Sequence, residues 1–224
     1  MTDLNSNLYA KLDPVFYDES SNSLNPFTRS YHGGRYVWIR EKIREIHHSF
    51  SSPAPLRILD VGGGSSAWNK EHLPVIAIDM NQKMLEYAKK CGRVTEFIIK
   101  NLNKTPWPMT EKSFDVVVVS EVLEHLDAHD SVLFEISRIL KDDGSLLLTV
   151  PLDKQFSLWR TLFGVECFVV GDVLGNDYYR KRCGHIQNFS SEQILVLLKR
   201  FGFTLIRMEN TLMNVRVMAK KSRG

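Results

Sequence analysis

Short runs of hydrophobic residues alternate with amphipathic segments along most of the chain. The apolar runs that have the length and composition of buried strands lie at residues 57–61, 75–79, 95–99, 114–119 and 146–150. The segments in which apolar residues recur with helical spacing are residues 36–46, 67–72, 82–91, 131–140 and 191–201. Strands that alternate with helices in this way predict a parallel sheet with helices on both faces.

Both ends of the chain depart from this alternation. Residues 1 to about 30 are rich in Asn, Ser, Asp and Pro, which predicts a loop or weakly ordered lead-in. The last two apolar runs, residues 203–208 and 212–219, are joined by a short turn. A short connection of this kind predicts an antiparallel pair of strands.

Size and charge set broad limits on the domain organisation. A chain of 224 residues with 43% hydrophobic residues can bury one sizeable core, so we expect a single domain over residues 1–224. Its outer parts would be an N-terminal lead-in and helix over residues 1–50 and a substrate-covering insertion over residues 151–184. The 29 basic and 26 acidic residues are interspersed, and a net charge of +3 neither requires nor excludes an anionic partner.

Cysteine use and hydropathy bear on the compartment. Cys91, Cys167 and Cys183 have no C-x-x-C spacing, which fits a reducing compartment better than a disulfide framework or a thiolate metal site. No apolar run has membrane-spanning length, and the polar N-terminal residues lack the features of a signal peptide. We therefore expect a cytoplasmic protein without a membrane span.

The most informative segment is a glycine turn between two apolar runs. Gly62, Gly63 and Gly64 follow the first run, and Asp79 ends the second. Glycines allow a tight turn and a close approach to a ligand, and a carboxylate can accept hydrogen bonds from ribose hydroxyls. This arrangement predicts an adenosine-type cofactor. The spacing G-x-G-x-x-G of nicotinamide dehydrogenases is absent, because Gly64 is followed by Ser, Ser and Ala.

A wider set of residues carries a resemblance to a known family. The set comprises Asp60, the glycine turn, Asp79, the segment 114–126 with Glu-Val-Leu-Glu-His, and the segment 140–151 with Asp-Asp-Gly. Together they resemble the class I S-adenosylmethionine-dependent methyltransferases, strongly over residues 56–150 and less strongly over residues 184–220. The resemblance implies an α/β fold with a Rossmann-like, doubly wound, seven-stranded sheet. That sheet would be mostly parallel, with an antiparallel last strand and helices on both faces.

The resemblance also assigns cofactor contacts, residue by residue. Asp60, Gly62 and Gly64 would flank the methionine part of S-adenosyl-L-methionine. Asp79 would bind the ribose, and Met80 would pack on the adenine.

Further along the chain, Asn101 with Leu102 would lie near the adenine amine, and Ser120 would line the cofactor. Two positions depart from the family pattern. Ser66 replaces a frequent third glycine, and Asn101 replaces an acid, although an amide oxygen can still accept a hydrogen bond from an amine.

The N-terminal segment resembles the lead-in of quinone-biosynthesis O-methyltransferases. The matching residues are Leu24-Asn-Pro26 and His32-Gly-Gly-Arg35. The resemblance implies that Arg35, rather than Arg29, approaches the cofactor carboxylate, where a guanidinium can form two hydrogen bonds. The alternative is that Arg35 is a surface residue on an amphipathic helix.

Glu121, Glu124 and His125 have a spacing that would place them on one face of a helical turn. The same Glu-x-x-Glu-His, with a distant histidine such as His185, resembles segments of quinone methyltransferases and of small-RNA 2'-O-methyltransferases that use a divalent ion. These four residues would then hold Mg²⁺ or another divalent cation. Without a metal, His125 or His185 is a candidate general base. A purely structural role for the turn is the third alternative.

The insertion would determine the acceptor. Its aromatic residues are Phe156, Trp159, Phe163, Phe168, Tyr178 and Tyr179. They could form a lid over a small molecule, stack on a nucleic acid, or simply pack together. Acidic residues nearly balance basic ones in this stretch, which favours a small-molecule acceptor.

We therefore predict an enzyme that moves a methyl group from S-adenosylmethionine to an oxygen or nitrogen nucleophile of a small molecule. The alternatives are an RNA 2'-O-methyltransferase with a divalent metal and a non-catalytic S-adenosylmethionine-binding regulatory partner.

Overall fold

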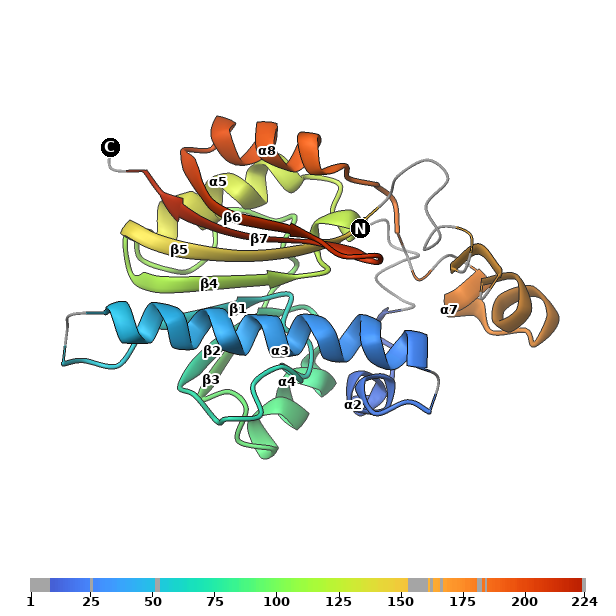
Figure 1. The fold of residues 1–224 in the computed structure, drawn as a ribbon. Coiled ribbons are helices and arrows are strands. Elements are labelled where there is room, and N and C mark those ends of the chain that lie inside the picture. The colour runs from blue at the N-terminus through green and yellow to red at the C-terminus, as the bar shows by residue number, and fades with distance from the viewer. Residues whose placement is uncertain are drawn as a thin grey trace.

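The centre of the computed structural model is a twisted seven-stranded sheet with the strand order β3-β2-β1-β4-β5-β7-β6 (Figure 1). The structure describes residues 9–24, 26–50, 53–152, 161, 163–165, 167–180, 183 and 185–222. The strands are β1 (Ile58–Val61), β2 (Val75–Asp79), β3 (Glu96–Ile99), β4 (Phe114–Ser120), β5 (Leu140–Pro151), β6 (Phe203–Asn210) and β7 (Asn214–Lys221). Neighbouring strands from β3 to β5 pair in parallel, whereas β7 runs antiparallel to both β5 and β6. The predicted Rossmann-like fold class, with its antiparallel last strand, is therefore confirmed.

Helices cover both faces of this sheet, as Figure 1 shows. The helical elements are α2 (Phe16–Ser21), α3 (Pro26–Ser49), α4 (Gln82–Lys90), the 3₁₀ turn η1 (Leu123–His125), α5 (His129–Ile139), the π-helical η2 (Cys167–Val173), α7 (Asp177–Arg180) and α8 (Ser191–Arg200). Helices α5 and α8 lie on one face, and α3 and α4 lie on the other (Figure 1). Among the described residues, no helix is both long enough and apolar enough to cross a membrane.

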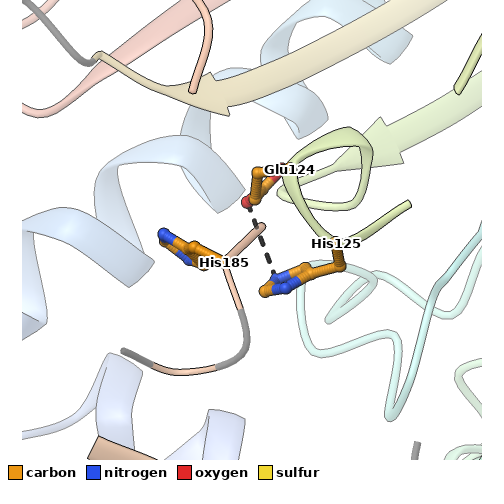
Figure 2. Close-up of side chains that lie close together, drawn as sticks. All are labelled: Glu124, His125 and His185. Carbon is orange, nitrogen blue, oxygen red and sulfur yellow. Dashed lines mark ion pairs between the residues drawn. The ribbon is translucent and has the colours of Figure 1, made fainter. Parts of the chain in front are cut away.

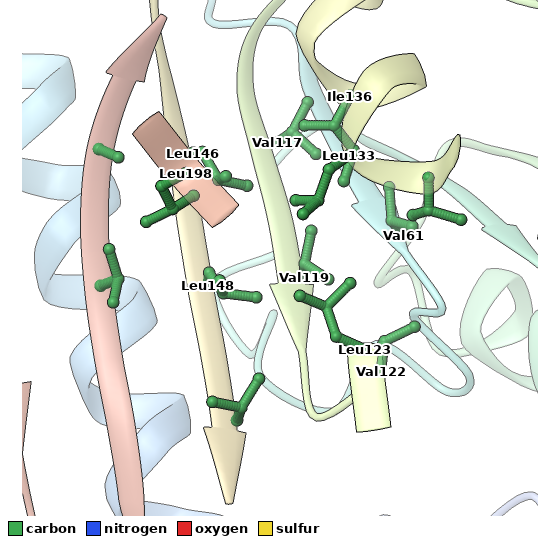
Figure 3. Packing of buried hydrophobic residues seen from close by; sticks show 14 of the residues in the cluster. Val61, Val117, Val119, Val122, Leu123, Leu133, Ile136, Leu146, Leu148 and Leu198 are labelled. Atoms are coloured by element: carbon green, nitrogen blue, oxygen red, sulfur yellow. The ribbon is translucent and has the colours of Figure 1, made fainter. Parts of the chain in front are cut away.

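Buried side chains form a separate core on each face of the sheet. In β4, Val117 and Val119 point into the core under α5 and α8, while Val116 and Val118 point into the core under α3. This alternation follows from the two-residue repeat of a strand, and a strand covered on both faces is apolar throughout. Figure 3 shows the first core, where side chains of β1, β4 and β5 meet Leu133 and Ile136 of α5.

The predicted helix at residues 67–72 is wrong, because this segment forms successive turns. Ser66 has a φ of 44°, outside the helical region. The Asn69 side chain also replaces helical hydrogen bonds. Its amide group donates to the carbonyls of Leu73 and Arg93, and its oxygen accepts from the Leu73 amide.

The predicted loop over the first thirty residues is also wrong in part. Helix α2 begins at Phe16, and α3 begins at Pro26, ten residues before the predicted helix at 36–46. Local sequence favoured a loop here, but a tertiary contact stabilises α2. The Arg93 guanidinium donates two hydrogen bonds to Asp18, at 2.7 and 2.9 Å. Elsewhere the predicted strands and helices are present, mostly with small shifts at their ends. The exception is β5, which begins at Leu140 rather than at residue 146.

A core substitution tests the packing of α3 on the sheet. Ile39 is fully buried, so we expect Ile39→Ala to lower the free energy of unfolding by about 2–5 kcal/mol through lost burial and a residual cavity. The matched control is Ile206→Ala on the edge strand β6, where the side chain is 52% exposed and the loss should stay below about 1 kcal/mol. Urea denaturation measures both values. Equal losses would contradict the placement of α3.

Candidate functional site

The carboxyl ends of β1, β2 and β4 open into a cavity of about 470 Å³. Parallel strands place their carboxyl ends at one edge of a sheet, which is where ligands bind in open α/β folds. The predicted site residues that line the cavity are Arg35, Asp60, Gly62, Asp79, Met80, Asn101, Leu102, Ser120, Glu121, Glu124, His125 and His185. The remaining one, Gly64, donates its amide hydrogen to Asp79. The structure thus brings residues from distant parts of the chain to one edge.

Asp79 at the end of β2 is buried, with 2% of its surface exposed. Its Oδ2 accepts hydrogen bonds from the Gly64 amide and the Tyr9 hydroxyl, both at 2.9 Å, and its Oδ1 accepts from the Asn81 amide at 2.8 Å. Burial raises the pKa of Asp79, and these hydrogen bonds partly oppose that rise because they stabilise the charged form. The carboxylate therefore joins the glycine turn to the second strand.

Glycine is required in the turn itself. Gly62 has a φ of 64°, and a Cβ there would lie 2.6 Å from the Val122 side chain. At Gly63 a Cβ would lie 2.5 Å from Oδ2 of Asp60. Any larger residue would push either the turn or its neighbours out of place, so the backbone stays open toward the cavity.

Asp60 lies near the end of β1, two residues before Gly62 of the glycine turn. Its Oδ2 accepts hydrogen bonds from the Ser66 hydroxyl and from the indole N–H of Trp68, each at 2.8 Å. Burial raises the pKa of Asp60 to about 7, although the two hydrogen bonds act in the opposite direction. Ser66, at the position of the missing glycine, thus has a role of its own, because it orients the Asp60 carboxylate.

Arg35 is the buried cation of the site, with 3% of its surface exposed. Its guanidinium lies 4.9 Å from the ring centroids of both Tyr31 and Tyr36. Burial lowers the pKa of Arg35, but Tyr36 and Glu121 more than offset this, so the group stays charged. The interpretation of Arg35 as a surface residue is therefore wrong. Within the described part of the chain, its Nε and Nη1 have no hydrogen-bond partner, so the group can receive an anion from the cavity.

The predicted helical face of Glu121, Glu124 and His125 does not form as a unit. Glu121 has a φ of 57°, so the short helical turn begins only at Leu123. The Glu121 carboxylate instead accepts hydrogen bonds from the Tyr31 hydroxyl and, at 2.7 Å, from the Thr149 hydroxyl. These contacts hold Glu121 at the end of β4, outside the group formed by the other predicted metal ligands.

Glu124, His125 and His185 do come together (Figure 2). One potential ligand atom from each lies within 4.8 Å of the others, and Nε2 of His125 is 3.8 Å from Oε1 of Glu124. The segment that carries His185 is tied to the turn, because the amides of Ile186 and Gln187 both donate to the Glu124 carbonyl. Two distant segments thus converge on one cluster.

The electrostatics of this cluster are unusual. Glu124 is 1% exposed, and neither of its carboxylate oxygens accepts a hydrogen bond from any residue that the structure describes. Burial, together with the charge of Glu121, raises the pKa of Glu124 well above its ordinary value. Burial and the neighbouring His125 lower the pKa of His185 to about 3. A buried acid with two unused oxygens beside a neutral imidazole is a donor set that suits a cation.

Tyr9 and Tyr31 are among the cavity residues that the sequence did not reveal, and both contact predicted site residues. Tyr9 lies in a segment without a motif, and no local signal marked it. Tyr31 precedes Arg35 by four residues on the same helix, so the i, i+4 spacing would have placed both on the cavity side.

The predicted lid is only partly described. Phe163, Val169 and Tyr179 line the cavity, whereas Phe168 is 61% exposed. The predicted lid residues that lie outside the described residues are Phe156 and Trp159, and the side chain of Tyr178 is not described either.

Comparison with known proteins gives a consistent result. A family profile described as "Methyltransferase domain" matches residues 36–208. A demethylmenaquinone methyltransferase of Thermotoga maritima is 29% identical over 163 residues, which cover 66% of this chain and 70% of that protein. A ubiquinone biosynthesis O-methyltransferase of Pelagibacter ubique is 28% identical over 187 residues, which cover 79% of this chain and 78% of that protein.

The fold is shared with solved structures of low sequence identity. A magnesium protoporphyrin IX methyltransferase from Synechocystis with bound SAH has a TM-score of 0.62 at 15% identity. The match covers 99% of this chain and 95% of that one.

The raised pKa of Asp60 predicts a pH-dependent effect of Asp60→Asn on stability. The carboxyl keeps its proton up to about pH 7 in the folded state, against 3.8 as its ordinary value. The folded state therefore binds this proton more tightly than the unfolded state does, and the free energy of unfolding of the wild type falls as the pH rises from about 4 to about 7. The variant does not titrate, so its stability relative to the wild type should rise by up to about 4 kcal/mol from pH 4 to pH 8. Urea denaturation of both proteins at pH 4 and pH 8 measures the difference in their free energies of unfolding. A difference that does not change with pH would contradict the raised pKa of Asp60.

Proposed function

The chain belongs to the methyltransferase domain family and is an S-adenosylmethionine-dependent methyltransferase, and from this premise we propose that its acceptor is a small, largely apolar molecule. The methyl group would pass to an oxygen or nitrogen of that molecule. The observation that supports this best is that one cavity is lined both by the glycine turn with Asp79 and by apolar side chains with titratable groups.

In this proposal the cofactor lies along the carboxyl edge of the sheet. Asp79 accepts hydrogen bonds from the ribose hydroxyls, and Met80 packs on the adenine. Arg35 binds the methionine carboxylate, which is supported by its burial and its two unused N–H groups. Asp60 lies close enough to the glycine turn to attract the methionine ammonium.

The remaining cofactor contacts complete the same path. Asn101 with Leu102 meets the adenine amine, Gly62 and Gly64 leave room for the methionine chain, and Ser120 lines it from the end of β4. The hydroxyls of Ser120 and Thr149 are 3.1 Å apart, so Ser120 has a partner that can orient it.

The acceptor would occupy the part of the cavity nearest to His125. Leu126 follows His125, and the ring of Phe163 stacks on His185 at 5.4 Å between ring centroids. Both line the cavity together with Val165 and Val169, and this lining favours an apolar or planar molecule. The two relatives named above support this chemistry, since one is a demethylmenaquinone methyltransferase and the other an O-methyltransferase of ubiquinone biosynthesis. We propose a planar, ring-bearing acceptor of that general kind.

The reaction would be a direct displacement. A lone pair of the acceptor attacks the methyl carbon as the carbon–sulfur bond breaks, and its electrons neutralise the sulfonium to give S-adenosylhomocysteine. The cavity would hold the two reactants in line, which is the main catalytic contribution in such a transfer. The acceptor hydroxyl must also lose a proton. His125 is the suitable base, because His185, with a pKa of about 3, is a weak one.

We further propose that Glu124, His125 and His185 hold a divalent cation. The unused oxygens of Glu124 and the neutral imidazole of His185 fit such an ion, and carboxylate with imidazole suits Mn²⁺ or Fe²⁺ as well as Mg²⁺. When bound, the ion would lower the pKa of the acceptor hydroxyl. A nitrogen of His125 that binds the ion cannot also accept a proton. Removal of the ion with a chelator therefore distinguishes the two roles: activity should be lost if His125 binds a metal and kept if it acts as the base.

Cofactor binding is tested by calorimetric titration with S-adenosylhomocysteine, with NADH as a control ligand. We expect binding of the first alone. Asp79→Ala should weaken it by about 1.5–3 kcal/mol, because hydrogen bonds from ribose to a charged group are lost. The control is Asp142→Ala, which removes an exposed carboxylate paired with Lys112 and should leave the affinity unchanged. Equal affinities for all three proteins would contradict the ribose assignment.

The cation proposal is tested without any acceptor. Mn²⁺ binding to the chelator-treated protein, followed by electron paramagnetic resonance, should show one site that is lost or weakened at least tenfold in Glu124→Gln. Glu86→Gln, which changes an exposed glutamate on α4, serves as the control. Mn²⁺ affinity that is absent in the wild type, or identical in Glu124→Gln, would leave this turn with a structural role.

A further inference from the structure

The hydroxyl of Tyr9 lies where the ribose of the cofactor is expected. It donates to Oδ2 of Asp79 at 2.9 Å, and the Asn81 side chain donates to the Tyr9 carbonyl at 2.9 Å. The same hydroxyl is 3.1 Å from the position that a Cβ would take at Gly64. Tyr9 therefore rests directly on the glycine turn.

Counting donors shows that Asp79 has room for only one of the two ribose hydroxyls. A carboxylate has about four lone-pair sites. The amides of Gly64 and Asn81 occupy two of them, and the Tyr9 hydroxyl occupies a third. The two amides belong to the turns that build the site, so they stay. Tyr9 is the donor that must withdraw when both ribose hydroxyls bind Asp79.

Tyr9 belongs to an N-terminal cap, which we define as residues 9–24 and 26–32. In Figure 1 the cap lies at the end of α3, next to α4. Its ties to the rest of the protein are largely polar: Asp18 pairs with Arg93, and Tyr31 donates to Glu121. Tyr17 is a partly buried residue of the cap that packs against the core, but among the described residues the buried hydrophobic side chains begin only at Tyr36, beyond the cap. Few buried apolar contacts mean a low free energy of local opening.

A glycine lies where the cap meets the anchored part of α3. From Tyr36 onward the helix is packed on the sheet by Trp38, Ile39 and Ile43. At Gly33 a Cβ would meet nothing closer than the Ser21 carbonyl at 3.7 Å, so packing does not require glycine there. Glycine inside a helix costs about 1 kcal/mol relative to alanine, and it gives the backbone freedom to bend.

We propose that the cap is a cofactor gate that turns at Gly33, with Tyr9 as the residue that competes with the ribose for Asp79. The inference rests on the proposed function of Asp79. In the closed form the Tyr9 hydroxyl occupies Oδ2 of Asp79 and covers the glycine turn. Cofactor binding exchanges the tyrosine hydroxyl for a ribose hydroxyl on the same oxygen.

The affinity of Tyr9→Phe for S-adenosylhomocysteine tests the competition. The variant keeps the ring but lacks the competing hydroxyl, so we expect it to bind about tenfold more tightly than the wild type. A residue that merely supported the fold, or that contacted the cofactor, would give unchanged or weaker binding when altered. Unchanged or weaker binding therefore overturns the gate. Tighter binding cannot result from partial unfolding.

Stopped-flow kinetics test the hinge, with Trp68 on the cavity wall as a fluorescent reporter. Gly33→Ala should slow both association and dissociation of S-adenosylhomocysteine severalfold and leave the dissociation constant within about twofold. Unchanged rate constants would overturn the hinge at Gly33. If neither the wild type nor Tyr9→Phe binds the ligand, the ribose assignment itself fails and the gate with it. If only Tyr9→Phe binds, the proposed function stands and the gate is closed in the wild type.

Discussion

The structure of the site depends on the buried carboxylate of Asp79 and the backbone amides that hold it. The Gly64 and Asn81 amides bind its two oxygens, so the carboxylate joins the turn after β1 to the turn after β2. Burying a charge costs free energy unless the charge is paired or hydrogen-bonded. That requirement keeps the glycine turn closed around the carboxylate and fixes the edge of the cavity.

The same requirement explains why charges of both signs are buried around one cavity. Glu124 and Arg35 are both nearly inaccessible and line the cavity, and among the described residues the Glu124 oxygens and two nitrogens of Arg35 have no hydrogen-bond partner. Unfilled capacity of this kind destabilises an empty site, and bound groups of opposite charge would fill it. Changes that satisfied these groups within the protein would therefore raise its folding stability and lower its affinity for ligands.

Much of the fold followed from local patterns, because strands covered on both faces are apolar throughout and glycine turns are distinctive. The cofactor edge could be located for the same reason. Two local predictions failed where contacts with Arg93 decide the local structure. The Asn69 side chain donates to the Arg93 carbonyl in place of a helical hydrogen bond, and the Arg93 guanidinium donates to Asp18 and stabilises α2. Glu121 was predicted to share a helical face with Glu124, but its positive φ is set by contacts with Thr149 that spacing alone cannot reveal. Tyr9 has no sequence signal at all, because its role comes entirely from the place where the folded chain puts it.

The most direct test of the roles of Asp79 and Arg35 is a crystal structure of the protein with bound S-adenosylhomocysteine. We expect the ribose hydroxyls to lie within hydrogen-bonding distance of Asp79 and the amino-acid carboxylate to meet the guanidinium of Arg35. A ligand whose ribose lies away from Asp79, or whose carboxylate is bound elsewhere while Arg35 stays unpaired, would contradict it.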